Sequence, residues 1–126
     1  MTRQLAVFIE NKPGSLAEVT ATLAEAQVNI ESIMVEGMHE FGVARLQVSP
    51  LKSAEKALDE AGFQFHTGDV VVIKIPNKPG ALHAVIAKLA KARVNVESVF
   101  GTTGSTGEAE MVLRVDDPEK ARKILS

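Results

Sequence analysis

Apolar residues along this chain fall into two patterns, continuous runs of strand length and positions spaced three or four apart as on one face of a helix. Residues 5–9 form a continuous run, and a helical stripe then follows at Leu16, Val19, Leu23 and Ala26. The other elements predicted in the first half are strands at 28–35, 41–48 and 63–67, a hairpin loop at 36–40 and a helix at 53–61. This order of elements predicts an α+β sandwich, with an antiparallel sheet and both helices on one face.

A turn sequence shows that the chain is duplicated. The residues NKPGSL at 11–16 return as NKPGAL at 77–82, an offset of 66 positions. At this offset, residues 9–32 and 75–98 are identical at 15 of 24 positions. Two copies of one unit therefore make up the protein.

The second copy follows the same order of elements. Its predicted elements are a strand at 70–75, a helical stripe at Leu82, Val85, Ile86 and Leu89, strands at 94–100 and 109–115, a flexible hairpin loop at 101–107 and a last helix at 117–125. It has no counterpart of the strand at 63–67. The short segment Thr67-Gly68-Asp69 is the predicted boundary between two domains, 1–68 and 69–126.

The missing strand matters for the edge of the second sheet. In a strand order 4-1-3-2 it would lie at an edge, so its loss need not open the core but leaves 70–75 unpaired on one side. We expect another chain or the first copy to cover this edge.

The core of each repeat is small. The strand at 41–48 is expected to bury Val43, Leu46 and Val48. A repeat of some 66 residues is marginally stable alone, so the repeats should pack on each other or on a second chain.

The repeated turn has the chemistry of a helix start. Proline suits a turn, and glycine takes backbone angles that other residues avoid. Ser15 and Glu18 match a capping box, which predicts that the helix begins there. Backbone N–H groups at such a start lack a partner inside the helix and lie at the positive end of its dipole. The turn is therefore a natural place to hold a carboxylate, and Lys12 and Lys78 could help to attract one.

Composition excludes several classes of function. The net charge is −2 with mixed signs, and only 4% of residues are aromatic, which argues against a nucleic-acid surface. The absence of cysteine excludes disulfides and thiolate chemistry. Three scattered histidines, His39, His66 and His83, lack metal-ligand spacing, and no nucleophile, base and orienting group occur together. We therefore predict a protein that is not an enzyme and needs no cofactor or metal. Without a signal-like segment, we expect it in the cytoplasm, with no membrane as partner.

Each copy resembles an ACT domain, the small-molecule-sensing module attached to many enzymes of amino-acid metabolism. The residues that carry the resemblance are Asn11, Pro13, Gly14, Leu16 and Asn29 in the first copy and Asn77, Pro79, Gly80, Leu82 and Asn95 in the second. The pattern covers essentially the whole chain, which is similar to free-standing tandem ACT proteins. The resemblance implies two ferredoxin-like βαββαβ sandwiches with sheets side by side, and amino-acid binding near the domain interface.

The ligand-binding residues that follow lie in the two turns and after the two first helices. The turns map to Asn11, Pro13, Gly14, Ser15 and Leu16 and to Asn77, Pro79, Gly80, Ala81 and Leu82, with Asn29 and Asn95 after the helices and Ile30 and Val96 as further apolar walls. Structural roles compete with these assignments, since glycine can serve the turn alone and the post-helix asparagines could close it in a left-handed conformation. Because Ala81 replaces Ser15, the two sites are expected to differ.

Two functions follow from the resemblance. The first is a regulatory protein that binds a free amino acid between ACT domains, as a homodimer, with a metabolic enzyme as possible partner. The alternative is a regulatory or interaction subunit of an amino-acid biosynthetic enzyme that senses nothing itself.

Overall fold

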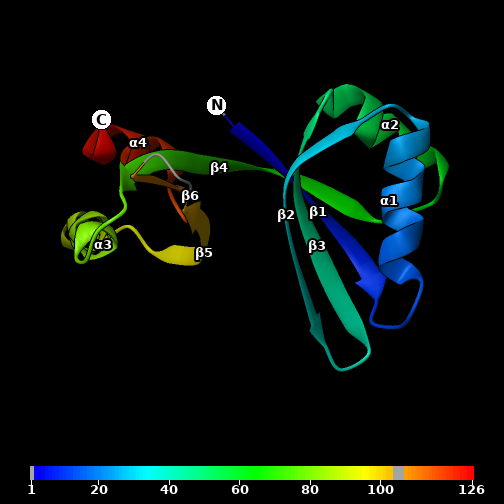
Figure 1. Ribbon diagram of the computed structural model, residues 1–126, viewed down its shortest axis with the longest axis horizontal. Helices are drawn as coiled ribbons and strands as arrows, with labels where there is room; N and C mark the ends of the chain where they lie inside the picture. Colours follow the sequence, from blue (N-terminus) through cyan, green and yellow to red (C-terminus); the bar gives the residue numbers. More distant parts are fainter. Residues whose placement is uncertain (1, 104–106) are drawn as a thin grey trace. The chain divides into compact units, whose positions relative to one another are not determined.

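The structure is a computed structural model that describes residues 2–103 and 107–126 (Figure 1). The strands are β1 (Thr2–Glu10), β2 (Asn29–Met38), β3 (Phe41–Ser49), β4 (Phe65–Pro76), β5 (Val96–Thr103) and β6 (Glu108–Val115). The helices are α1 (Ser15–Glu25), α2 (Leu51–Glu60), α3 (Ala81–Lys91) and α4 (Pro118–Leu125). No helix in the described ranges has the length and apolar character needed to cross a membrane. The chain divides into a first unit, Arg3–Gly68, and a second unit, Asp69–Ser126 with Thr2.

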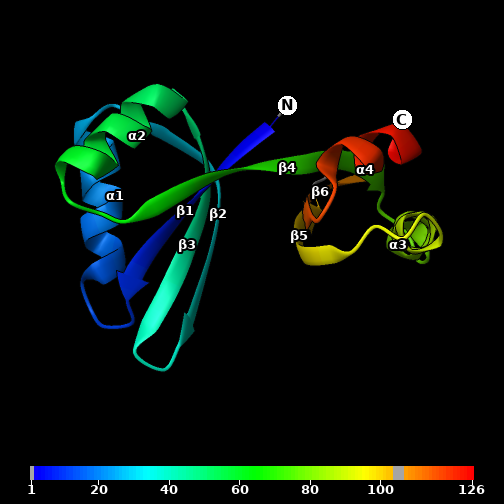
Figure 2. The ribbon, with the colours of Figure 1, turned by 180° about the vertical axis from the view of Figure 1, so that it is seen from behind.

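The first unit has the predicted order of elements. Its sheet runs β2-β3-β1-β4, so the predicted strand order 4-1-3-2 is confirmed. Figures 1 and 2 show α1 and α2 on the same face of this sheet. The antiparallel register places Leu5 opposite Leu46 and Val7 opposite Ala44, and all four side chains are buried beneath the helices.

The core of the first unit corrects one sequence prediction. Val43 is only half-buried, whereas its neighbour Ala44 is fully buried with Leu46. Side chains along a strand alternate between faces, so two residues three positions apart cannot both face the helices. Val48 does pack on the core, as predicted.

The second unit is a smaller version of the same arrangement. Its three strands run β4-β6-β5, and α3 and α4 lie on one face of them (Figure 2). Leu89 of α3, Leu113 of β6 and Ala121 of α4 are fully buried at the centre.

The strands predicted at 63–67 and 70–75 are parts of one continuous strand. Thr67, Gly68 and Asp69 lie inside β4, which continues without a break from Phe65 to Pro76. Gly68 does not adopt the left-handed backbone found at Gly14. Glycine is permissive rather than turn-forming by itself, so its presence did not end the strand.

The start of α1 is predicted correctly, but its cap is not. Gly14 occupies the capping position with φ 92°, and Ser15 is the first helical residue with no side-chain capping hydrogen bond. A capping side chain needs an extended backbone outside the helix, which Ser15 does not have. The capping box is therefore wrong, and the turn depends on glycine at a left-handed position.

The turns after the two first helices also correct a prediction. The left-handed residues are Gln27 and Arg93, with φ of 59° and 63°, rather than Asn29 and Asn95. In the first unit, the N–H of Gln27 donates to Ala24 and that of Val28 to Leu23, which closes the helix before Asn29 is reached. The left-handed position therefore falls two residues earlier than expected.

Both hairpins are tighter than predicted. β2 continues to Met38 and β3 starts at Phe41, so the loop predicted at 36–40 contains only His39 and Glu40. β5 likewise continues to Thr103 into the loop predicted at 101–107. Positions 104–106 of that loop lie outside the described residues.

Candidate ligand-binding site

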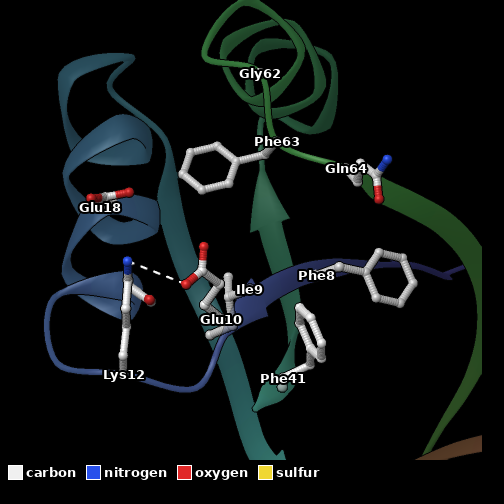
Figure 3. A pocket seen from close by; sticks show the side chains of 11 residues that line it. Phe8, Ile9, Glu10, Lys12, Glu18, Phe41, Gly62, Phe63 and Gln64 are labelled. Atoms are coloured by element: carbon white, nitrogen blue, oxygen red, sulfur yellow. Dashed lines mark ion pairs between the residues drawn. The ribbon is translucent and has the colours of Figure 1, made fainter.

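A pocket of about 450 Å³ lies in the first unit, where β1 ends and α1 begins (Figure 3). Its volume falls in the range of roughly 300–1,000 Å³ that is typical of small-molecule sites. Three segments line it: the facing ends of β1 and β3, the turn with the start of α1, and the connection from α2 to β4. The lining residues are Phe8, Ile9, Glu10, Lys12, Ser15, Glu18, Phe41, Gly42, Gly62, Phe63 and Gln64.

The open edge of β1 explains why the pocket forms there. The N–H of Phe8 donates to the carbonyl of Gln64 at 3.0 Å, immediately before β4 begins. Ile9 and Glu10 continue β1 beyond this point, and the chain of α2 and its connection pass above them in Figure 3. The pocket is thus the space left where β4 no longer follows β1.

One side of the pocket is charged. The Nζ of Lys12 lies 3.2 Å from Oε2 of Glu10, and both side chains are well exposed, at 60% and 63%. Figure 3 shows Lys12 and Glu18 on the α1 side, with Glu10 in the middle. An exposed ion pair contributes only about 0–1 kcal/mol. Lys12 and Glu10 can therefore exchange partners with a ligand at little cost.

The start of α1 adds uncharged donors to this side. The N–H of Ser15 donates to the carbonyl of Lys12 and that of Glu18 to Gly14, whereas helical geometry leaves the N–H groups of Leu16 and Ala17 without an acceptor inside the helix. Ser15 lines the pocket with only 8% of its surface exposed. Its hydroxyl has no hydrogen bond within the described parts of the chain. In the described residues, this oxygen is not one of the buried polar atoms that lack a partner, so a ligand or water can reach it.

The opposite side is aromatic. Phe8 and Phe41 lie across the pocket from Lys12 and Glu18, and Phe63 reaches in from the α2 to β4 connection (Figure 3). Phe8 and Phe41 are 53% and 65% exposed, although phenylalanine normally buries most of its ring. The pocket therefore combines a polar side and an apolar side, as a site for a small amphipathic molecule requires.

Asn11 has a structural role that the sequence did not indicate. Its backbone N–H donates to the carbonyl of Glu40 at 2.7 Å, and its Nδ2 donates to the carbonyl of His39 at 2.9 Å. The asparagine thus fastens the turn after β1 to the β2–β3 hairpin. It does not line the pocket.

The other predicted residues of the first unit are spread over three environments. Ser15 lines the pocket, whereas Pro13, Gly14 and Asn29 are exposed and do not. Leu16 and Ile30, predicted as apolar walls, pack instead against the buried core. The structure therefore brings the start of α1 to the pocket and separates it from the post-helix asparagine.

The predicted residues of the second unit line neither of the two pockets described. A smaller pocket of about 230 Å³ involves Arg122, Leu125 and the middle of β4, away from the turn at 77–82. In the turn at 77–82, Asn77, Pro79 and Gly80 are exposed, Ala81 is half-buried and Leu82 is 36% exposed. Asn95 is exposed and its N–H donates to Oδ1 of Asp116 at 3.0 Å, while Val96 packs on the core.

Sequence reasoning missed most of the pocket. Phe8, Phe41 and Phe63 were assigned to strands and Glu10 to no element, because local pattern does not reveal which strand ends meet. One signal was available: three of the chain's five phenylalanines lie in these segments, in a protein without tryptophan or tyrosine.

Comparison with known proteins finds a family and relatives that match nearly the whole chain. The family described as an ACT domain pair matches residues 1–126. A protein of Bacteroides thetaiotaomicron with a known crystal structure is 35% identical, with a TM-score of 0.92 over 98% of this chain and 85% of that one. The acetolactate synthase small subunit of Mycobacterium bovis is 28% identical over 98% of this chain and 86% of its own length. The regulatory subunit of aspartate kinase from Thermus thermophilus is 18% identical and shares the fold, with a TM-score of 0.71 over 98% and 90% of the two chains.

Proposed function

Because the chain belongs to the ACT domain pair family, we propose that it is a regulatory protein that senses a free amino acid, and that the pocket of the first unit is the binding site. The observation that carries the proposal is the pairing of opposite charges in one pocket. A free amino acid carries an ammonium and a carboxylate on the same carbon, and few other small metabolites do. A cation for the ligand carboxylate, Lys12, lies in the turn, and a carboxylate for the ligand ammonium, Glu18, lies in the first turn of α1.

The charges suggest one orientation for the ligand. Its carboxylate would accept hydrogen bonds from the Ser15 hydroxyl and the free N–H groups at the start of α1, with Lys12 nearby. Its ammonium would lie between the carboxylates of Glu10 and Glu18. The side chain would then extend toward the three phenylalanines.

The second unit lacks most of the polar residues that line the pocket of the first, which supports a single site. At the repeat offset, Pro76 replaces Glu10, Ala81 replaces Ser15 and Ala84 replaces Glu18. Among the charged and hydroxyl-bearing residues Glu10, Lys12, Ser15 and Glu18, only Lys12 keeps its chemistry in the second unit, as Lys78. We therefore assign one amino-acid site to each chain, in the first unit.

A regulatory output requires that the ligand favour one conformation or assembly. A ligand shifts such an equilibrium only through contacts that differ between the two states. We propose that the protein acts as a non-catalytic homodimer, and that a metabolic enzyme is its partner. The relatives named as small or regulatory subunits support this arrangement. Light scattering of the purified protein should give a mass near twice 13.5 kDa; a monomeric mass with and without ligand would contradict the dimer.

Thermal unfolding of the purified protein against each of the twenty amino acids tests the proposal. A ligand at ~100 times its dissociation constant stabilises the native state by about 2.7 kcal/mol, which raises the unfolding midpoint by several degrees. We expect such a shift with one amino acid or a few related ones. No shift with any of them, in folded protein shown to be free of ligand, would refute the sensor function.

A matched pair of variants then locates the site. Ser15→Ala with Glu18→Ala gives the first unit the residues of the second at these positions and should abolish the shift. Ala81→Ser with Ala84→Glu makes the reverse change in the second unit and should leave it intact. Loss of the shift in the second double variant alone would show that the site lies in the second unit and would refute its placement in the first.

A subunit without sensing remains the second candidate, because several relatives are named acetolactate synthase small subunits. Its signature would be stable co-purification with a catalytic chain whose activity changes on binding, with no response to any amino acid. An amino-acid response that persists in the isolated protein would favour the sensor instead.

A further inference from the structure

We infer that the ligand of this pocket is an aromatic amino acid, an inference that rests on the proposed function and adds the class of side chain. The first observation is the concentration of aromatic residues. The chain has five phenylalanines and no tyrosine or tryptophan, and Phe8, Phe41 and Phe63 all line this pocket. They come from β1, β3 and the connection after α2, so the fold gathers them from distant parts of the sequence.

The second observation is that two of these three rings are not used by the core. Phe41 is 65% exposed and Phe8 is 53% exposed, and neither belongs to the buried cluster of the first unit. Phe63 packs partly on that cluster while its ring also lines the pocket. Two large exposed rings at the rim of one pocket are unusual on a protein surface and indicate a binding surface.

The third observation is the division of the pocket into two sides. Lys12, Glu10 and Glu18 occupy the α1 side and middle, and Phe8 and Phe41 the opposite side (Figure 3). A ligand held by its ammonium and carboxylate on the α1 side must direct its side chain at the phenylalanines. Aromatic rings pair in offset or edge-to-face arrangements that add to simple burial of apolar surface. A ring therefore matches this wall better than a branched aliphatic chain.

The second unit again provides an internal comparison. Lys74 stands at the position of Phe8, and Glu108, which pairs with Pro76 in the sheet, stands at the position of Phe41. The aromatic wall and the two carboxylates are thus absent from the same unit. Loss of both features together is expected if they serve one ligand.

Isothermal titration of the full chain with phenylalanine, tyrosine, tryptophan, leucine and valine tests the inference. We expect at least one aromatic amino acid to bind about tenfold more tightly than leucine or valine, which corresponds to about 1.4 kcal/mol. Phenethylamine and 3-phenylpropionate, which lack the carboxylate and the ammonium respectively, should each bind much more weakly than phenylalanine. Equal or tighter binding of the aliphatic amino acids would overturn the inference and leave the proposed function standing. Binding of none of these five would also overturn the inference, and the unfolding measurement with all twenty amino acids would then decide the proposed function.

Three leucine variants provide the structural control. Phe41→Leu removes an exposed ring and should not impair folding, yet should weaken binding of the aromatic ligand about tenfold and bring its affinity near that of leucine. Phe63→Leu should act in the same direction. Phe100→Leu, in β5 of the second unit, removes a half-buried ring outside the pocket and should leave the affinity unchanged. Unchanged affinity in Phe41→Leu and Phe63→Leu, with a change in oligomeric mass, would overturn the inference and identify the rings as a contact between copies of the chain.

Discussion

The two units of this protein share the geometry of the glycine turn and the helix that follows it but differ in surface chemistry. Gly14 and Gly80 both cap a helix with left-handed φ, at 92° and 85°, and Leu23 and Leu89 are equivalent and fully buried. At the pocket, by contrast, the second unit has lost the carboxylates, the hydroxyl and the exposed rings. The residues that are identical in the two repeats therefore form the turn and the core. The residues that differ carry the candidate binding chemistry.

The second helix of each unit shows the same contrast. In the first unit, Oγ1 of Thr67 donates to Oε2 of Glu55 on α2 at 2.7 Å. In the second, Arg122 occupies the equivalent place on α4 and binds both carboxylate oxygens of Asp69, with Nη1 to Oδ2 at 2.9 Å. The buried alanines beside them, Ala54 and Ala121, are conserved between the two copies. Packing is thus retained while the polar contact next to it is exchanged.

The largest expected effects come from the equivalent core leucines. Leu→Ala substitutions at fully buried sites cost about 2–5 kcal/mol, depending on how far the site relaxes. Leu23→Ala should lie at the upper end, because the first unit surrounds it with the larger core. Leu89→Ala should lie at the lower end, since Leu82 of α3 is exposed and Val85 and Ile86 are only half-buried. Urea unfolding measures both, and a larger cost for Leu89→Ala would contradict this ranking.

The two turn glycines should separate folding from binding. A side chain at a left-handed position costs about 1–2 kcal/mol, and neither site offers a steric clash. Gly14→Asp and Gly80→Asp should therefore lose similar stability. Only Gly14→Asp places a negative charge next to the proposed carboxylate site, so it should weaken amino-acid binding by roughly a hundredfold, about 2.7 kcal/mol. Equal affinities in the two folded variants would count against a site at this turn.

The ion pair of the second unit should have a smaller effect. Asp69 and Arg122 are mostly shielded, and Nη2 of Arg122 also donates to the carbonyl of Val70 at 3.0 Å. Asp69→Asn is expected to cost about 1–2 kcal/mol after allowance for solvent screening, and Thr67→Val in the first unit about 1 kcal/mol. Urea unfolding at low and high salt measures both, and only the Asp69→Asn difference should shrink with salt.

The pH dependence of this contact follows from Arg122. Its hydrogen bond to Asp69 raises the pKa of Arg122 above its usual value. A group with a raised pKa stabilises the fold below its unfolded pKa and loses that contribution only as the pH rises through the folded value. The contribution of the guanidinium should therefore be constant through neutral pH and disappear only in strongly alkaline solution. A loss near neutral pH would show that another group is responsible.

The smallest effect is expected at the repeated asparagine. Asn11→Ala removes the hydrogen bond to His39 and should cost about 0.5–1.5 kcal/mol. Asn77 keeps the backbone bond, to Gly107, but its side chain makes no hydrogen bond to the described residues. Asn77→Ala should therefore be nearly neutral in the same unfolding measurement. Equal losses at both positions would indicate a shared role for the side chain.

Most of the fold could be predicted because its signals are local and occur twice. The helix starts at Ser15 and Ala81 follow from the Pro-Gly turns, and the strand order follows from the order of elements. The errors arose where one residue type serves several conformations, as with Gly68 inside β4 and Ser15 after its cap. The candidate site was only partly predictable, since Ser15 reached the pocket whereas Leu16 and Ile30 were drawn into the core.

The amino-acid sequence by itself determined that this protein is a duplicated α+β sandwich with two glycine turns, because periodicity and turn chemistry act over a few residues. Only the tertiary structure decided which residues share a pocket. Phe8, Phe41 and Phe63 are far apart in the chain and meet because β1 pairs with β3 and receives the end of the α2 connection at Gln64. Which distant residues come together depends on the strand register and on where one strand ends beside another, and no local sequence pattern encodes these long-range pairings.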